Sequence, residues 1–238
     1  MKPLASTAAA ACAIAVLLAG VGPSAFAADR PYLLTNNAAA EEDDDGVWSF
    51  ESFWQRTGSL SLFSVAPEYA FSPTTSVQFE LSSERDRDDA GRTQELEIEF
   101  KHLFNHIARD GWGWGLVASL SFATDEGTGW RRSAWALRVP LSWQIGSSGV
   151  VLHANAGVAR ERDGPRLWQR SLAAEREVAR HLVAFVELGR VGETTLAHGG
   201  IRYWVRREKI AVDLSMLRQR SSGMRDSGAV LGLAFYDL

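Results

Sequence analysis

Cysteine is almost absent from this chain of 238 residues, because Cys12 is the only one. Without a second cysteine the chain has no disulfide framework, and thiol chemistry is not available for function. Cys12 also lies within an N-terminal segment that has the features of an export signal. We therefore expect the mature chain to contain no cysteine at all.

Long apolar runs are also missing beyond the first 27 residues. No later stretch of about eighteen consecutive apolar residues occurs, which excludes a membrane-spanning helix there. A chain rich in strands can still span a membrane as a closed β-barrel, since closure pairs every backbone polar group.

Sequence motifs for catalysis and cofactor binding are lacking too. There is no phosphate-binding loop, dinucleotide fingerprint or zinc motif. No histidine stands in a His-x-Ser arrangement, since His153 is followed by Ala-Asn and His198 by Gly-Gly. We predict that the protein is not an enzyme and holds no cofactor or metal; a lipid acyl-modifying enzyme assembled from distant strands is the third alternative. The formal net charge of −4 argues against a nucleic-acid partner.

The N-terminus has the organisation of a signal peptide. Lys2 supplies the positive charge, residues 8–19 form the apolar region, and Ala25-Phe26-Ala27 is a small-x-small cleavage site. Residues 28–46 follow as an acidic leader, with a block of five acidic residues at 41–45, and we expect this leader to be disordered. Three regions result: a signal peptide at 1–27, the leader at 28–46 and a β-barrel at 47–238.

The stretch of residues 133–145, SAWALRVPLSWQI, has the clearest secondary-structure pattern. Every second residue from Ser133 to Ile145 is apolar apart from the first, and the residues between them are small or polar. A period of two indicates a strand with one apolar face. At roughly 3.3 Å per residue, a strand of this length can cross a bilayer obliquely.

The same alternation recurs along the rest of the chain. It predicts an all-β fold, a transmembrane antiparallel up-and-down barrel of twelve strands, with ten as the alternative count. Short connections alternate with longer, more charged ones, and an even strand count places both ends of the barrel on the short-turn, periplasmic side. The predicted strands are residues 47–56, 59–71, 76–84, 93–104, 112–124, 133–145, 150–161, 167–178, 182–190, 195–206, 210–219 and 228–236.

A soluble β-sandwich or a lipocalin-like barrel would alternate in the same way. Here the face opposite the apolar one is rich in glycine, alanine and serine, and tryptophans lie near strand ends. Both features favour lipid contact on the apolar face, with aromatic anchors at the two membrane interfaces. The expected interface aromatics are Trp112, Trp114, Trp135, Trp143 and Trp168.

The closing segment GAVLGLAFY, residues 228–236, resembles the last strand of bacterial outer-membrane barrels, which usually end at an aromatic residue; here Asp237 and Leu238 follow it. The segments IRYW at 201–204 and IAVDLS at 210–215 are similar to the last hairpins of small proteobacterial outer-membrane barrels. That group includes proteins described as outer-membrane transporters, some linked with phenol-degradation pathways. The resemblance implies an outer-membrane location and insertion by the barrel-assembly machinery.

If the apolar faces meet lipid, the other faces line the lumen. The expected lumen-lining residues are Glu80, Glu95, Glu97, Glu99, Lys101, Arg138, His153, Glu175, Glu177, Glu187, Arg202 and Asp213. Carboxylates outnumber bases in this set, so the leading hypothesis is a narrow channel for passive or facilitated passage of small solutes. The alternative is a barrel plugged by cross-lumen ion pairs, with a structural or surface-interaction role. Expected partners are outer-membrane lipids and lipopolysaccharide, the assembly machinery and small solutes.

Overall fold

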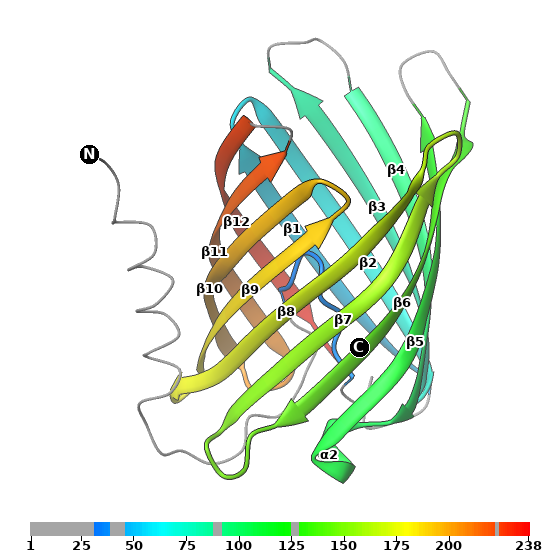
Figure 1. Ribbon diagram of the computed structural model, residues 1–238. Helices are drawn as coiled ribbons and strands as arrows, with labels where there is room; N and C mark the ends of the chain where they lie inside the picture. The colour runs from blue at the N-terminus through cyan, green and yellow to red at the C-terminus, as the bar shows by residue number, and fades with distance from the viewer. Residues whose placement is uncertain (1–30, 39–45, 88–91, 125–128, 222–223) are drawn as a thin grey trace.

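The protein is a closed barrel of antiparallel strands in the computed structural model, which describes residues 31–38, 46–87, 92–124, 129–221 and 224–238. Each strand pairs with its neighbours in the chain, and β1 closes the barrel against β12 (Figure 1). Within these residues there are twelve strands, so the predicted twelve-stranded barrel is confirmed.

The strands are long enough to cross a bilayer obliquely. One short helix, α2 (Ile107–Asp110), connects β4 to β5. The strand bounds are β1 Val47–Thr57, β2 Leu60–Ser72, β3 Thr75–Asp86, β4 Arg92–Asn105, β5 Trp112–Thr124, β6 Arg131–Gln144, β7 Val150–Glu161, β8 Arg166–Ala179, β9 Leu182–Val191, β10 Thr194–Arg206, β11 Ile210–Ser221 and β12 Met224–Phe235.

No helix in the part of the chain that the structure describes is long and apolar enough to cross a membrane.

The predicted strand limits agree with the structure to within a few residues, and β5 and β7 match at both ends. The largest difference is at β12, which begins at Met224 rather than at residue 228. Arg220 pairs with Arg225 and Ser221 with Met224, so most of the charged stretch that was expected to be a loop is paired strand. Charged residues on both faces hid the alternation, since a strand that extends beyond an apolar belt needs no apolar face.

The two ends of the barrel differ. The end that contains α2 and the β2–β3, β6–β7, β8–β9 and β10–β11 connections is here called the turn end, and the opposite end is called the loop end (Figure 1). Phe235 pairs with Phe50 and with Ile210, so the last strand finishes at the turn end.

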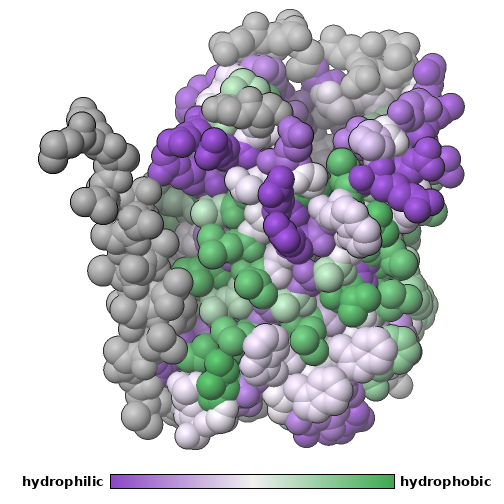
Figure 2. All heavy atoms as spheres, in the orientation of Figure 1, coloured by the Kyte–Doolittle hydropathy of each residue, from purple (hydrophilic) through white to green (hydrophobic). Residues whose placement is uncertain are grey.

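The outer surface of the barrel is apolar and its inside is polar. On β6, Leu137 points outward with 41% of its surface exposed, whereas Ser142 points inward and is fully buried. Figure 2 shows apolar side chains over the middle of the visible face, with hydrophilic residues gathered toward the loop end. The largest fully buried side chains include Arg202, His153, Glu175 and Glu187. In a soluble barrel the apolar face of each strand points inward and the polar face meets water, so the distribution here is the reverse.

The expected disordered leader is wrong for residues 31–38, which lie inside the barrel and are here called the lumen segment. Thr35, Asn37 and Ala38 are buried in the lumen segment. Composition predicted disorder because this stretch has no core of its own; the barrel wall supplies its partners. The rest of that leader up to residue 45, and the predicted signal peptide at 1–27, lie outside the described residues.

Candidate functional site

The lumen segment enters the barrel from the turn end and returns toward it. Near the turn end, the amide of Ile107 in α2 donates to the carbonyl of Ala38 at 3.1 Å. Deeper in the lumen, the hydroxyl of Thr35 donates to Ser171 of β8 at 2.7 Å. Tyr32 then lies beside Glu175, four residues closer to the β8–β9 turn than Ser171. The segment is thus a re-entrant loop with its apex at Leu33 and Leu34.

The apex is held by a buried carboxylate. Both oxygens of Glu187 on β9 accept backbone N–H groups, one from Leu33 at 2.9 Å and one from Leu34 at 2.8 Å. The Nδ1 atom of His198 lies 3.2 Å from the same carboxylate, and its Nε2 atom is hydrogen bonded to Ser215 at 2.8 Å. Hydrogen bonds to an ionised carboxylate are stronger than those between neutral groups, so Glu187 is the main polar anchor of the apex.

A second group of contacts joins the two ends of the loop. The hydroxyl of Tyr32 donates to Glu175 at 2.8 Å, and its ring lies 5.4 Å from the ring of His153. His153 is hydrogen bonded through Nδ1 to the hydroxyl of Ser142 at 2.7 Å, and Ser142 accepts the amide of Ala38 at 2.8 Å. The wall of β6, β7 and β8 thereby fixes both ends of the lumen segment.

Apolar packing and one glycine shape the part of the wall that holds the apex. Leu33 and Leu34 pack against a cluster that contains Leu196, Leu217 and Val230, to which Phe53 also contributes. A Cβ atom at Gly189 would lie 2.6 Å from the Leu34 side chain, which is closer than real contacts allow. Glycine at this position leaves the space that Leu34 occupies.

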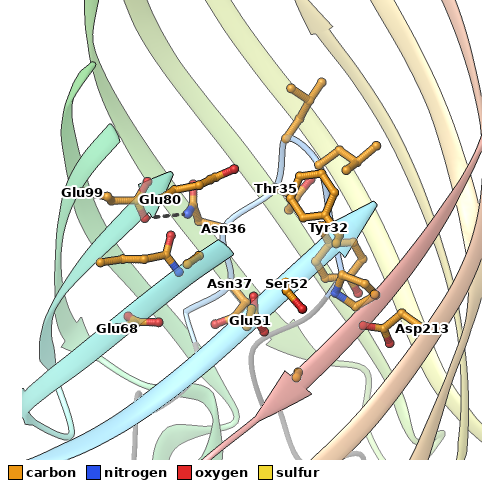
Figure 3. Close-up of a pocket in the computed structure, with 18 of the residues that line it drawn as sticks. Tyr32, Thr35, Asn36, Asn37, Glu51, Ser52, Glu68, Glu80, Glu99 and Asp213 are labelled. Atoms are coloured by element: carbon orange, nitrogen blue, oxygen red, sulfur yellow. Dashed lines mark hydrogen bonds between the residues drawn. The ribbon is translucent and has the colours of Figure 1, made fainter. Parts of the chain in front are cut away.

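A cavity of about 170 Å³ remains between the lumen segment and the opposite wall (Figure 3). Asn36 of the segment reaches across it and donates through Nδ2 to Glu99 on β4 at 3.0 Å. Carboxylates outnumber bases by six to three in the cavity lining, which therefore has an acidic excess. The charged lining residues are Glu51, Glu68, Glu80, Glu97, Glu99, Asp213, Lys101, Arg138 and Arg202.

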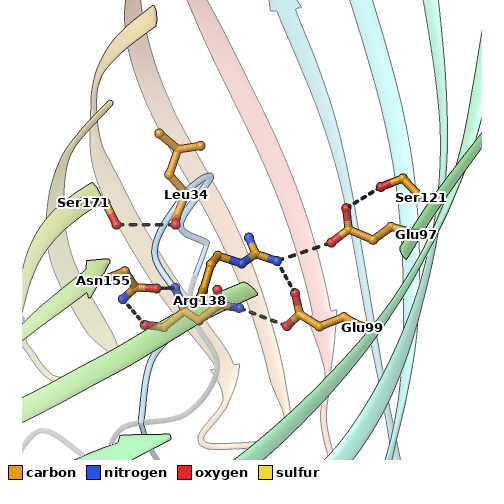
Figure 4. Close-up of polar contacts among 8 residues, drawn as sticks. Leu34, Glu97, Glu99, Ser121, Arg138, Asn155 and Ser171 are labelled. Atoms are coloured by element: carbon orange, nitrogen blue, oxygen red, sulfur yellow. Dashed lines mark hydrogen bonds and ion pairs between the residues drawn. The ribbon is translucent and has the colours of Figure 1, made fainter. Parts of the chain in front are cut away.

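Arg138 on β6 bridges two of these carboxylates (Figure 4). Its guanidinium bonds to Glu99 and lies 3.4 Å from Glu97, which also accepts the hydroxyl of Ser121 at 3.2 Å. Asn155 on the same side of the barrel exchanges two hydrogen bonds with the backbone of Asn36. Arg138 thus neutralises part of the negative charge of Glu97 and Glu99 on β4 and leaves a polar lumen.

A second arginine organises the lumen near the turn end. Arg202, 1% exposed, makes a bidentate ion pair with Asp213 at 2.7 and 2.8 Å and donates to the hydroxyl of Tyr236 at 2.8 Å. That hydroxyl in turn donates to Glu51 on β1. The guanidinium also lies 5.5 Å from the Trp204 ring centroid, within the range of a cation–π contact. Tyr236, just after β12, is thereby tied to the inside of the wall.

The structure places the expected lumen residues in three groups. One group lines the cavity: Glu80, Glu97, Glu99, Lys101, Arg138, Arg202 and Asp213. A second group, His153, Glu175 and Glu187, is buried behind the lumen segment. Glu95 lines a separate hollow toward the loop end, and Glu177 is bonded to Arg207 at the turn end.

The expected interface tryptophans all lie on outward positions of their strands. Trp112 and Trp143 are directly paired on β5 and β6 near the turn end, and Trp114 is close by. Trp135 and Trp168 lie toward the loop end, where Trp168 is 76% exposed. Aromatic residues near both ends of an apolar outer face are typical of a membrane-spanning barrel.

Ser215, His198 and Glu187 form a chain of hydrogen bonds that no sequence motif predicted. Their order of hydrogen bonds matches that of an acyl-transfer triad. Ser215 is only 2% exposed and is not among the cavity-lining residues, and Glu187 is engaged with the lumen segment. The cluster therefore helps to hold the lumen segment in place. The alternation of inward and outward positions along β10 and β11 places His198 and Ser215 inside the barrel, but no local motif joins residues on separate strands.

The closed barrel, its apolar outer band and its charged lumen define the class of protein: this is an outer-membrane β-barrel. The chain belongs to the family described as Uncharacterised conserved protein UCP029691, whose model matches residues 13–227. A search of curated protein sequences found no match to this chain.

Solved structures with the same fold include porins and other outer-membrane proteins. The KdgM porin in complex with disordered oligogalacturonate has a TM-score of 0.56 at 8% identity, over 79% of this chain and 98% of that one. The NanC porin has a TM-score of 0.57 at 7% identity, over 80% of this chain and all of that one. Omp33 from Acinetobacter baumannii has a TM-score of 0.52 at 8% identity, over 81% and 98%. At these identities the likeness concerns the fold.

Proposed function

We propose that this protein is a narrow outer-membrane channel for small solutes, and that the path runs along the cavity beside the lumen segment. The observation that supports the proposal is the cavity itself: a polar space of about 170 Å³ inside a membrane-spanning barrel. A cavity of this size has room for several water molecules. The path is therefore suited to ions and small solutes.

The charge of the lining points to cations and basic solutes. Six carboxylates face three basic side chains around the cavity, and low-dielectric walls strengthen their combined field. Glu68 and Glu80 accept hydrogen bonds from wall serines, Ser76 and Ser64, which orient both carboxylates in the lumen. Rings of carboxylates favour cations in channels. The KdgM porin was solved with oligogalacturonate, an acidic oligosaccharide; an acidic lumen predicts a different solute for this protein.

A neutral aromatic solute is the second candidate, in keeping with the resemblance to transporters linked with phenol-degradation pathways. Tyr32 and Phe53 both line the cavity and offer aromatic surface. The proposal includes a signal peptide at 1–27, a periplasmic turn end, lipid contact through the outer tryptophans, and contact of the arginine-rich loop end with lipopolysaccharide.

Conductance of the purified protein in planar bilayers tests the proposal. The expected result is ion-conducting steps with a reversal potential that shows cation preference. Changing Glu95, Glu97 and Glu99 together to glutamine should reduce that preference, whereas Glu193→Gln in the exposed β9–β10 connection should not. If neither the wild type nor the variants conduct any ion or pass any solute, the protein is a plugged barrel with a structural or surface role. Hydrolysis of lipid acyl chains by that same protein would favour the enzyme alternative.

A further inference from the structure

The lumen segment is held mainly by side chains of the wall. Ser142, Asn155, Ser171, Glu175 and Glu187 bond it from β6 to β9. Among the described residues, its backbone-to-backbone hydrogen bond with the barrel runs from the amide of Ile107 to Ala38. The strand pairings from β1 to β12 are complete around the barrel without any part of the segment. Removal of residues 31–38 therefore breaks no strand-to-strand hydrogen bond.

Most of the hydrogen bonds of the segment described above run to one side of the lumen, from β6 to β9. Elsewhere in the lumen, Asn36 donates to Glu99 across the cavity, and Leu33 and Leu34 pack against the apolar cluster that contains Val230. Cleavage after Ala27, as the sequence predicts, would leave three residues before Pro31. A short segment that is held mainly by side chains can leave toward the turn end without breaking the strand pairing of the barrel.

We infer that residues 31–38 are a removable plug that regulates the proposed channel. This inference rests on the proposed function, since a plug has meaning only where solutes pass. When the segment leaves, the cavity extends to the wall of β7–β9, and the buried carboxylates of Glu175 and Glu187 become part of the lumen lining. The open state is therefore both wider and more strongly cation-selective than the closed state.

A disulfide between the segment and the wall tests the inference. Thr35 and Ser171 are suitable positions, because their hydroxyl oxygens are 2.7 Å apart and cysteine replaces both side chains with little change in size. The double variant Thr35→Cys with Ser171→Cys is made in a Cys12→Ser background and measured in planar bilayers before and after reduction. Each single-cysteine variant is the matched control, and electrophoretic mobility with and without heating shows that every barrel is folded.

The plug predicts that oxidation lowers the mean conductance of the double variant at least twofold, that reduction restores it, and that neither single variant responds. It also predicts a larger conductance and a stronger cation preference for a chain that lacks residues 31–38. Equal conductance of the fully oxidised and the reduced double variant would mean that solutes pass beside a fixed segment, which overturns the plug and leaves the channel intact. If the reduced double variant and the deletion both fold and neither conducts, the channel proposal fails together with the plug.

Discussion

Replacement of Glu187 by glutamine isolates the strongest anchor of the lumen segment. The two carboxylate oxygens accept the amides of Leu33 and Leu34 at 2.9 and 2.8 Å inside a fully buried site. Glutamine keeps one acceptor, loses the charge and turns an N–H group toward one of those amides. One charge-assisted hydrogen bond is lost, and one buried amide is left without an acceptor.

The size of the effect follows from this exchange. Hydrogen bonds to charged groups are worth about 1.5–3 kcal/mol, so the seated state should lose about that much free energy relative to the displaced state. Since about 1.4 kcal/mol corresponds to a factor of ten, the ratio of open to closed time should rise by about 10- to 100-fold. Single-channel recordings of the purified variant measure this ratio directly.

Glu80→Gln is the matched control for lumen charge. It removes the same single charge from a cavity-lining position, but Glu80 accepts its hydrogen bond from Ser64 of the wall rather than from the lumen segment. The open-to-closed ratio should stay near that of the wild type in this control. Equal ratios for Glu187→Gln and Glu80→Gln would refute the role assigned to the backbone hydrogen bonds of the apex.

Two further predictions concern the barrel wall. Leu137→Arg places a charge on the lipid face near the middle of β6 and should destabilise the folded barrel by about 2–4 kcal/mol in urea unfolding from lipid vesicles, whereas the inward-facing Ala136→Ser should be nearly silent; equal tolerance would contradict the assigned faces. Tyr236→Phe removes a hydroxyl that links Arg202 to Glu51 and should cost about 1–3 kcal/mol in the same assay, so an unchanged unfolding midpoint would show that this link does not stabilise closure.

The alternation of side chains made most of the barrel predictable. On β6 the pattern from Trp135 to Trp143 is strict, and one face of a strand can be satisfied only by lipid or by a protein core. The small and polar residues on the opposite face favoured lipid over a protein core as the contact of the apolar face. The limits of β5 and β7 were predicted correctly because glycine and charged residues flank clear alternation there.

The lumen segment could not be predicted in the same way. PYLLTNNA has no period of two or of 3.6, and its partners are remote: Leu33 meets Glu187 across 154 positions of sequence. Nothing local distinguishes such a segment from a solvated leader. The alternation along β8 and β9 predicts which side of the wall each glutamate faces, but it does not predict what covers that glutamate.

Reaction of an engineered cysteine with a positively charged methanethiosulfonate tests directly whether solutes pass through the lumen. Gln78 on β3 lines the cavity, and its neighbour Phe79 points outward with 37% of its surface exposed. If solutes pass through the lumen, the reagent should reduce the current through Gln78→Cys and leave the current through Phe79→Cys unchanged, both in the Cys12→Ser background. An unchanged current at Gln78→Cys after complete labelling, or an equal loss at both positions, would contradict it.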